Sequence, residues 1–172
     1  MRHLLLLLMI PFTFSGGEEQ IILSELKDEI KEKEVKEKVV KVKEDHTDYL
    51  LEALIQVESQ GNEKAVGDKH LSRPSIGVLQ IRPIMVREVN RILKNQNIKI
   101  KYTLDDRYNK DKSIEMFMIW KMNHHPNDTD EVIARCWNGG PRGWKRKATL
   151  YYWNKVQNEI NNLKTQKLDN NE

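Results

Sequence analysis

The stretch LEALIQVESQG, residues 51–61, decides how the rest of the chain is interpreted. Its apolar residues Leu51, Leu54 and Ile55 recur at the spacing of a helix that buries one face. The next position of that stripe is Glu58. A carboxyl group on a core-facing stripe loses water, which raises its pKa toward the range that suits a general acid at neutral pH. The alternative is a solvated Glu at the end of the stripe, and position alone leaves both open.

The composition indicates one ordinary domain with polar tails. The chain has 172 residues, of which 32% are charged, so its apolar residues must be concentrated in part of the sequence. They occur at the N-terminus and from Tyr49 onward, and that length is enough to bury a core. A net charge of +3 is too small to indicate nucleic acid as the main ligand, whereas an anionic polymer remains compatible.

Residues 1–17 have the pattern of a secretory signal peptide. A basic start is followed by an apolar run from Leu4 to Phe14 and by small residues. The run is shorter than the roughly 20 residues of a membrane span. We therefore expect export to the periplasm or cell envelope, with an uncleaved signal anchor as the alternative that would tether the protein to the membrane. The only cysteine, Cys136, can form no internal disulfide, so the exported domain depends on its core.

A charged segment, residues 18–45, precedes the predicted domain. It consists mostly of Glu, Asp and Lys, and its apolar residues lose helical register between Ile30 and Val35. We expect a solvated helix or a partly disordered spacer, with a coiled coil as the alternative. The domain itself is expected at residues 46–164, followed by a polar tail at residues 165–172.

Within residues 46–164 the pattern predicts a mainly α domain of five or six helices. After the first helix, the segment 62–82 is too rich in Gly, Asp and Pro for a long helix and predicts a small turn-rich or β excursion. Pro83 suits the start of the second helix, and Asp111 can cap a later one. The run 116–120 is apolar on every side, which predicts a buried central helix.

Three short pieces require a common explanation. They are Glu58-Ser59, then Gly77-Val78-Leu79-Gln80, and then Trp137-Asn138-Gly139-Gly140-Pro141. Each alone is weak, but in this order and on this scaffold they resemble the lytic transglycosylases of the soluble transglycosylase (SLT, lysozyme-like) family. The resemblance covers roughly residues 49–156. It implies an α+β lysozyme-like fold around the buried helix.

The resemblance also implies a reaction. A peptidoglycan lytic transglycosylase cleaves the MurNAc-GlcNAc β-1,4 bond without water and forms a 1,6-anhydromuramoyl product. Glu58 would be the single general acid and base, first protonating the glycosidic oxygen and then deprotonating the muramoyl C6 hydroxyl. No metal or other cofactor is implied, and the expected partner is the glycan strand. No protein partner is predicted, and we expect a monomer.

Other positions carry over one at a time as substrate-binding residues. Ser59 matches the serine of the Glu-Ser pair and can fix the helix end, while Gln80 offers an amide to sugar groups. Gly77 allows a close approach by backbone or ligand. Trp137 stands where the family usually has tyrosine, which keeps an aromatic plane but removes a phenolic hydroxyl. Asn138 matches the asparagine, as a substrate contact or a structural bond at the helix end.

Two alternatives to the transglycosylase stay open. A hydrolytic lysozyme would use Glu58 with a second carboxylate, Asp68 or Asp105, that holds a water molecule. A glycan-binding module without activity could serve a secretion, conjugation or phage apparatus. The adjacent pair His124-His125 lacks the spacing of a helical zinc site.

One charged feature remains unassigned. Four basic residues cluster after the third motif and are suited to acidic peptide stems or to solvent: Arg142, Lys145, Arg146 and Lys147.

Overall fold

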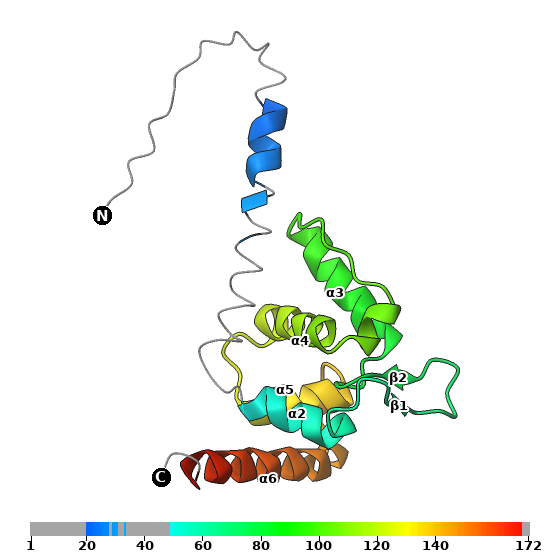
Figure 1. Ribbon diagram of the computed structural model, residues 1–172, viewed down its shortest axis with the longest axis vertical. Helices are drawn as coiled ribbons and strands as arrows, with labels where there is room; N and C mark the ends of the chain where they lie inside the picture. Colours follow the sequence, from blue (N-terminus) through cyan, green and yellow to red (C-terminus); the bar gives the residue numbers. More distant parts are fainter. Residues whose placement is uncertain (1–19, 28, 31–32, 34–48, 170–172) are drawn as a thin grey trace.

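The computed structural model describes residues 20–27, 29–30, 33 and 49–169 (Figure 1). Its helices are α2 (Tyr49–Ser59), α3 (Pro83–Asn95), α4 (Lys110–His124), α5 (Asp130–Gly139) and α6 (Ala148–Asp169), with the 3-10 turns η1 (Asp105–Tyr108) and η2 (Gly143–Lys145). The strands β1 (Val66–Gly67) and β2 (Ser75–Ile76) form one small hairpin. The predicted fold class, mainly helical with a small excursion after the first helix, is confirmed.

Helix α4 is the buried centre of the domain, as predicted. Its residues 116–120 are all buried, and Phe117 is among the most deeply enclosed side chains of the core. The expectation that Asp111 caps this helix is wrong. The side chain of Asn109 accepts the hydrogen bond from the backbone N–H of Lys112 at 2.9 Å, and Asp111 lies in the first turn.

The other helices are arranged around α4. Helix α6 packs along α2 and α5, and α3 packs on α4, so that α6 and α3 lie on opposite sides of the central layers (Figure 1). Helix α6 buries Val156 and Ile160 on one stripe. It continues through Asp169, beyond the predicted end of the domain at residue 164, because no Gly or Pro interrupts it.

The hairpin is fastened to η1 by Arg107. Strands β1 and β2 pair antiparallel, with Val66 opposite Ile76. The buried guanidinium of Arg107 donates hydrogen bonds to the backbone carbonyls of Leu104 (2.7 Å), Pro74 (3.2 Å) and Ile81 (3.2 Å). The Arg107 side chain thus joins Pro74, just before β2, and Ile81, just after the turn that follows β2, to the connection between α3 and α4.

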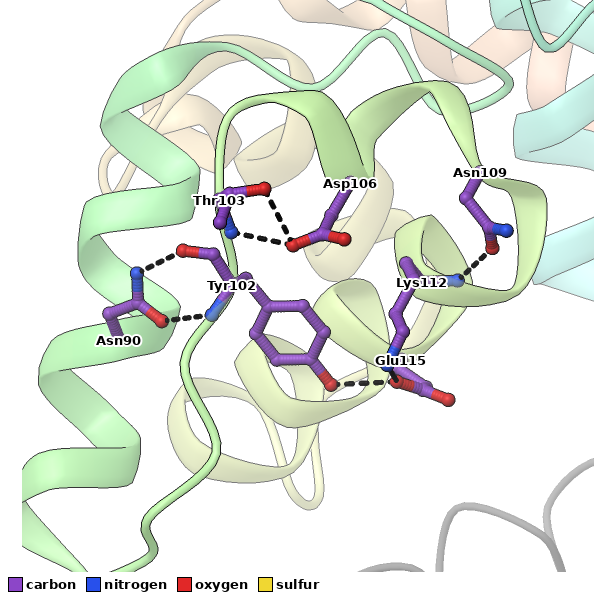
Figure 2. A network of polar contacts seen from close by, with 7 residues as sticks. All are labelled: Asn90, Tyr102, Thr103, Asp106, Asn109, Lys112 and Glu115. Carbon is purple, nitrogen blue, oxygen red and sulfur yellow. Dashed lines mark hydrogen bonds and ion pairs between the residues drawn. The ribbon is translucent and has the colours of Figure 1, made fainter.

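A polar network holds that connection (Figure 2). The amide of Asn90 on α3 accepts from the backbone N–H of Tyr102 and donates to its carbonyl, both at 2.8 Å. The Tyr102 hydroxyl donates to Glu115 on α4 at 2.8 Å. Asp106 accepts from both the backbone N–H and the hydroxyl of Thr103. These bonds fix η1 and therefore Arg107, although the segment has no regular helix or strand before η1.

Part of the N-terminal prediction lies outside the described residues. This applies to the signal peptide at 1–17 and to residues 18–19, 28, 31–32 and 34–45 of the charged segment. Residues 20–27, 29, 30 and 33 are helical, and their apolar side chains, including Leu23 and Leu26, are exposed. In the part of the chain that the structure describes, no helix is both long and apolar enough to cross a membrane. The spacer, the domain boundaries and the signal peptide stay predictions.

Candidate active site

Glu58 lies in the last turn of α2 and is partly buried, which decides between the two interpretations that its position left open. Burial raises the pKa of its carboxyl group from 4.5 to about 7, against the opposing effect of a hydrogen bond from Tyr152. The negative charge of Asp68 raises that pKa further. Near neutral pH, Glu58 can therefore give up a proton and take one back, which a solvated glutamate cannot do efficiently.

Tyr152 on α6 is the partner of this carboxyl group. Its hydroxyl donates to Glu58 Oε1 at 2.7 Å, across 94 positions of sequence. Burial and the neighbouring carboxylate raise the pKa of Tyr152 well above its usual range, so the phenol keeps its proton. None of the three sequence motifs contains this residue. Tyr152 occupies the same stripe as Val156 and Ile160, and this was the available signal, but spacing identifies a buried tyrosine without naming its partner.

Asp68 is the second carboxylate near Glu58. It follows β1 directly and has φ of 50°, a left-handed conformation uncommon for a residue with a side chain. Its carboxylate is exposed and lies 4.0 Å from Arg82 Nε. Asp105, the other candidate, is exposed at the start of η1, and its charge acts on Arg107.

Ser59 joins α2 to the hairpin. Its hydroxyl donates to the carbonyl of Val78 at 2.9 Å, with the carbonyl of Ile55 as a weaker second acceptor at 3.3 Å. Ser59 follows Glu58 directly, so the bond to Val78 also fixes the backbone that carries the carboxyl group. Ser59 thus links the helix end to the segment after β2, and a contact with substrate stays a prediction.

Gly77 and Gln80 make contacts within the protein that hold the hairpin and the turn after it. A Cβ on Gly77 would lie 1.9 Å from the backbone carbonyl oxygen of Arg107, so the close approach at this glycine is made by the protein's own backbone. The Gln80 amide accepts from Ser75 at 2.9 Å and donates to the carbonyls of Gly77 (2.9 Å) and Ala65 (3.3 Å). A sugar contact by either residue stays a prediction.

Trp137 and Asn138 lie at the end of α5. The Trp137 ring packs edge-on against Phe117 and Trp120, with both centroid separations at 5.1 Å. It is only partly buried, and Asn138 is exposed, which leaves the asparagine accessible to a ligand. The phenolic hydroxyl that Trp137 lacks is present in Tyr152, which approaches Glu58 from α6.

The two adjacent histidines each contact a carboxylate. His124 contacts Glu88 and His125 contacts Asp128, each at 2.7 Å. Cys136 is buried on α5. Across the described residues, no three His, Cys, Asp or Glu side chains gather closely enough to hold a metal ion.

Replacement of Tyr152 by Phe tests the geometry directly. Because the lost hydrogen bond favours the ionised form, we expect the Glu58 pKa to rise above about 7, by about one unit. Titration of the glutamate carboxyl carbons by NMR measures the shift. The Tyr151→Phe variant is the matched control, since the exposed Tyr151 belongs to the same helix and makes no recorded bond to Glu58. An unchanged Glu58 pKa in Tyr152→Phe would contradict the assignment.

Comparison with known proteins shows what the chain is similar to. Over 27 residues, 16% of this chain, the sequence is 59% identical to Invertebrate-type lysozyme 6 of Caenorhabditis elegans, and the match spans 20% of that relative's length. The fold is similar to a chain in the crystal structure of Aeromonas hydrophila PliI in complex with Meretrix lusoria lysozyme. The TM-score is 0.54 at 20% sequence identity, over 65% of this chain and 88% of that one.

The family comparison covers most of the domain. Residues 37–160 match the model of the Transglycosylase SLT domain, a region that contains Glu58, Tyr152 and all three motifs. The chain therefore belongs to the transglycosylase SLT domain family, a lysozyme-like family of glycan-cleaving domains.

Proposed function

We propose that this protein is a peptidoglycan lytic transglycosylase that cleaves the bond between N-acetylmuramic acid and N-acetylglucosamine. The observation that carries the proposal is the state of Glu58. Its pKa is raised to about 7 by burial, and its carboxyl group is held by Tyr152, so acid and base forms are both accessible near neutral pH. The exposed Asp68 has no comparable environment. One carboxyl group suffices when the substrate supplies its own nucleophile.

The reaction then has two proton transfers through the same group. Protonated Glu58 donates to the glycosidic oxygen, and the bond breaks with oxocarbenium character at the muramoyl C1. The substrate's N-acetyl group stabilises that carbon. Glu58, now a carboxylate, takes the proton of the muramoyl C6 hydroxyl, whose oxygen bonds to C1 and closes the 1,6-anhydro ring. The Tyr152 hydroxyl remains hydrogen-bonded to the carboxylate between the two steps.

Digestion of purified sacculi tests the proposal. We expect released muropeptides to carry the 1,6-anhydro end. Because no water is added, this end is lighter than the hydrolysed reducing end by the mass of one water, about 18 Da. Mass spectrometry of the products measures this difference. Products with only the hydrolysed end would remove the transglycosylase, and a zymogram without any clearing would favour a binding module.

A hydrolytic lysozyme is the second candidate, and one observation favours it. The charge of Asp68 raises the pKa of Glu58, although it is the smallest of the three influences on that carboxyl group. An inverting hydrolase needs a second carboxylate about 6.5 to 9.5 Å from the acid to hold water. The sacculus assay on Asp68→Asn separates the candidates: a transglycosylase keeps most of its activity, whereas such a hydrolase loses it.

The location of the protein is also a proposal. The pattern of residues 1–17 supports export to the periplasm or envelope. N-terminal sequencing of the protein recovered from the cell envelope checks this proposal, and recovery of intact protein from the cytoplasm alone would contradict it.

A further inference from the structure

A basic and aromatic surface lies on η2 and the first half of α6. The sequence from Val132 to Asn158 contains no Asp or Glu, although it contains six Lys and Arg residues. We call the exposed side chains there the basic–aromatic surface: Arg142, Trp144, Lys145, Arg146, Lys147, Tyr151 and Lys155. The surface includes the basic cluster that the sequence left unassigned.

Two lysines of this surface are held by aromatic rings. Lys145 Nζ lies 4.8 Å from the centre of the Trp144 ring, and Lys155 Nζ lies 4.7 Å from the centre of the Tyr151 ring. Both rings are exposed, Tyr151 to 71%. A ring face attracts an ammonium group without neutralising it. Each ring therefore holds the ammonium group of its lysine in position, and the charge and N–H donors of that group remain available to an external anion.

Some basic residues elsewhere on the domain are neutralised by a carboxylate. Arg91 pairs with Glu88, and Arg135, at the edge of this surface, pairs with Glu131. For the five basic side chains of the basic–aromatic surface, no carboxylate lies within ion-pair distance among the described residues. The concentrated positive charge is thus uncompensated by the protein and complements an anionic partner.

The surface shares helix α6 with Tyr152, the partner of the candidate acid. Tyr151 immediately precedes Tyr152, the residue that holds Glu58, and Lys155 lies one helical turn further along α6. Helix α5, which ends in the third motif, packs against both η2 and α6. An anionic group branching from a glycan that runs from Glu58 across η2 and the outer side of α6 therefore meets the basic side chains. The peptides attached to the muramoyl lactyl group carry free carboxylates and are such branches.

We propose that the basic–aromatic surface binds the carboxylates of the peptide stems of peptidoglycan, so that the protein prefers stem-bearing glycan to bare glycan. This inference rests on the proposed function for the identity of the polymer. Exposed charge contacts are individually weak and screened by salt, so the preference should come from several of them together and decline at high ionic strength.

Binding of the full chain to sacculi tests the inference. The surface variant Lys145→Gln/Lys147→Gln/Lys155→Gln is compared with the control Lys94→Gln/Lys101→Gln/Lys110→Gln, whose three lysines are also exposed. In either variant the three replacements lower the formal net charge by the same amount, three units. Binding is measured as the fraction of protein that sediments with the sacculi. All proteins carry Glu58→Gln, so that the sacculi are not cleaved during the measurement. The ligands are intact sacculi and sacculi stripped of stems by an amidase.

The expected result is selective. The surface variant should bind intact sacculi about five- to tenfold more weakly than the control, with equal binding to stripped glycan. Equal loss on both ligands, or no loss, overturns the inference. So does a variant that loses binding only to phosphatidylglycerol vesicles, because the surface would then serve a membrane. Cleavage is measured separately with Glu58 intact. Stem-dependent binding without cleavage would contradict the proposed function but not this inference. Cleavage without a preference for stems would contradict this inference but not the proposed function.

Discussion

Replacing Glu58 with Gln is expected to abolish glycan cleavage, with a loss of about a thousandfold or more in rate. The amide keeps the shape of the side chain but can neither donate an acid proton nor accept one. Since the proposed reaction uses this group twice, both steps fail. Turbidity loss of sacculi and release of muropeptides measure the rate.

Glu52→Gln is the matched control for this variant. Glu52 belongs to the same helix α2 but is exposed in its first turn, so its replacement should leave activity unchanged. Full activity in Glu58→Gln would remove Glu58 from the mechanism. Equal loss in both variants would mean that damage to α2, rather than loss of the acid, is responsible.

The pH dependence of stability provides an independent check on Glu58. Its folded pKa of about 7 lies above the ordinary value of 4.5, so the protonated form favours the folded state. That contribution is fully present below about pH 4.5 and is lost as pH rises through about 7. Gln cannot ionise. Relative to the wild type, the unfolding free energy of Glu58→Gln should therefore rise across this window, by up to about 3 kcal/mol.

Urea denaturation at pH 4.5 and pH 8 measures that difference. A constant gap between wild type and Glu58→Gln at the two pH values would contradict the raised pKa. The expected result is an unfolding free energy of Glu58→Gln that is higher, relative to that of the wild type, at pH 8 than at pH 4.5. That result would also show that the inactive variant is folded, because only a folded protein has an unfolding free energy to compare.

Gly77→Ala is expected to produce the second large effect, a loss of at least about 3 kcal/mol in unfolding free energy. Gly77 has φ of 79°, which strains any residue with a Cβ, and the added carbon would overlap the Arg107 carbonyl oxygen 1.9 Å away. The obstacle is backbone, which cannot rotate aside as a side chain can. The hairpin would have to separate from η1.

Gly61→Ala separates strain from overlap. Gly61 has nearly the same φ, 78°, but no atom lies within 4 Å of its added Cβ. Its replacement should therefore cost only about 1 kcal/mol. Urea denaturation of both variants gives the comparison. Equal costs would refute the packing of Gly77 on Arg107, whereas a stable Gly77→Ala protein with weak glycan binding would support the original expectation of a ligand contact.

Local patterns predicted much of the scaffold because helices are stabilised by contacts between residues three and four positions apart. The start of α3 at Pro83 and the all-apolar run of α4 correspond to the structure. The stripe that ends at Glu58 corresponds in part: Leu54 is buried, whereas Leu51 and Ile55 are half-buried. Where a choice depended on backbone geometry the prediction failed: Asn109, and not Asp111, receives the bond that caps α4. Neighbouring polar residues are similar candidates for a cap until the turn is formed.

The sequence by itself determined that a carboxyl group, Glu58, would end a core-facing stripe, because the helical period places it there. Only the tertiary structure decided how that group is supported. Packing of α6 on α2 brings Tyr152 to the carboxyl oxygen, and the bond from Ser59 to Val78 places the hairpin beside the helix. These partners are 94 and 19 positions apart, and no short-range periodicity specifies such pairings. They arise when buried surfaces are packed against one another and their polar groups must find partners.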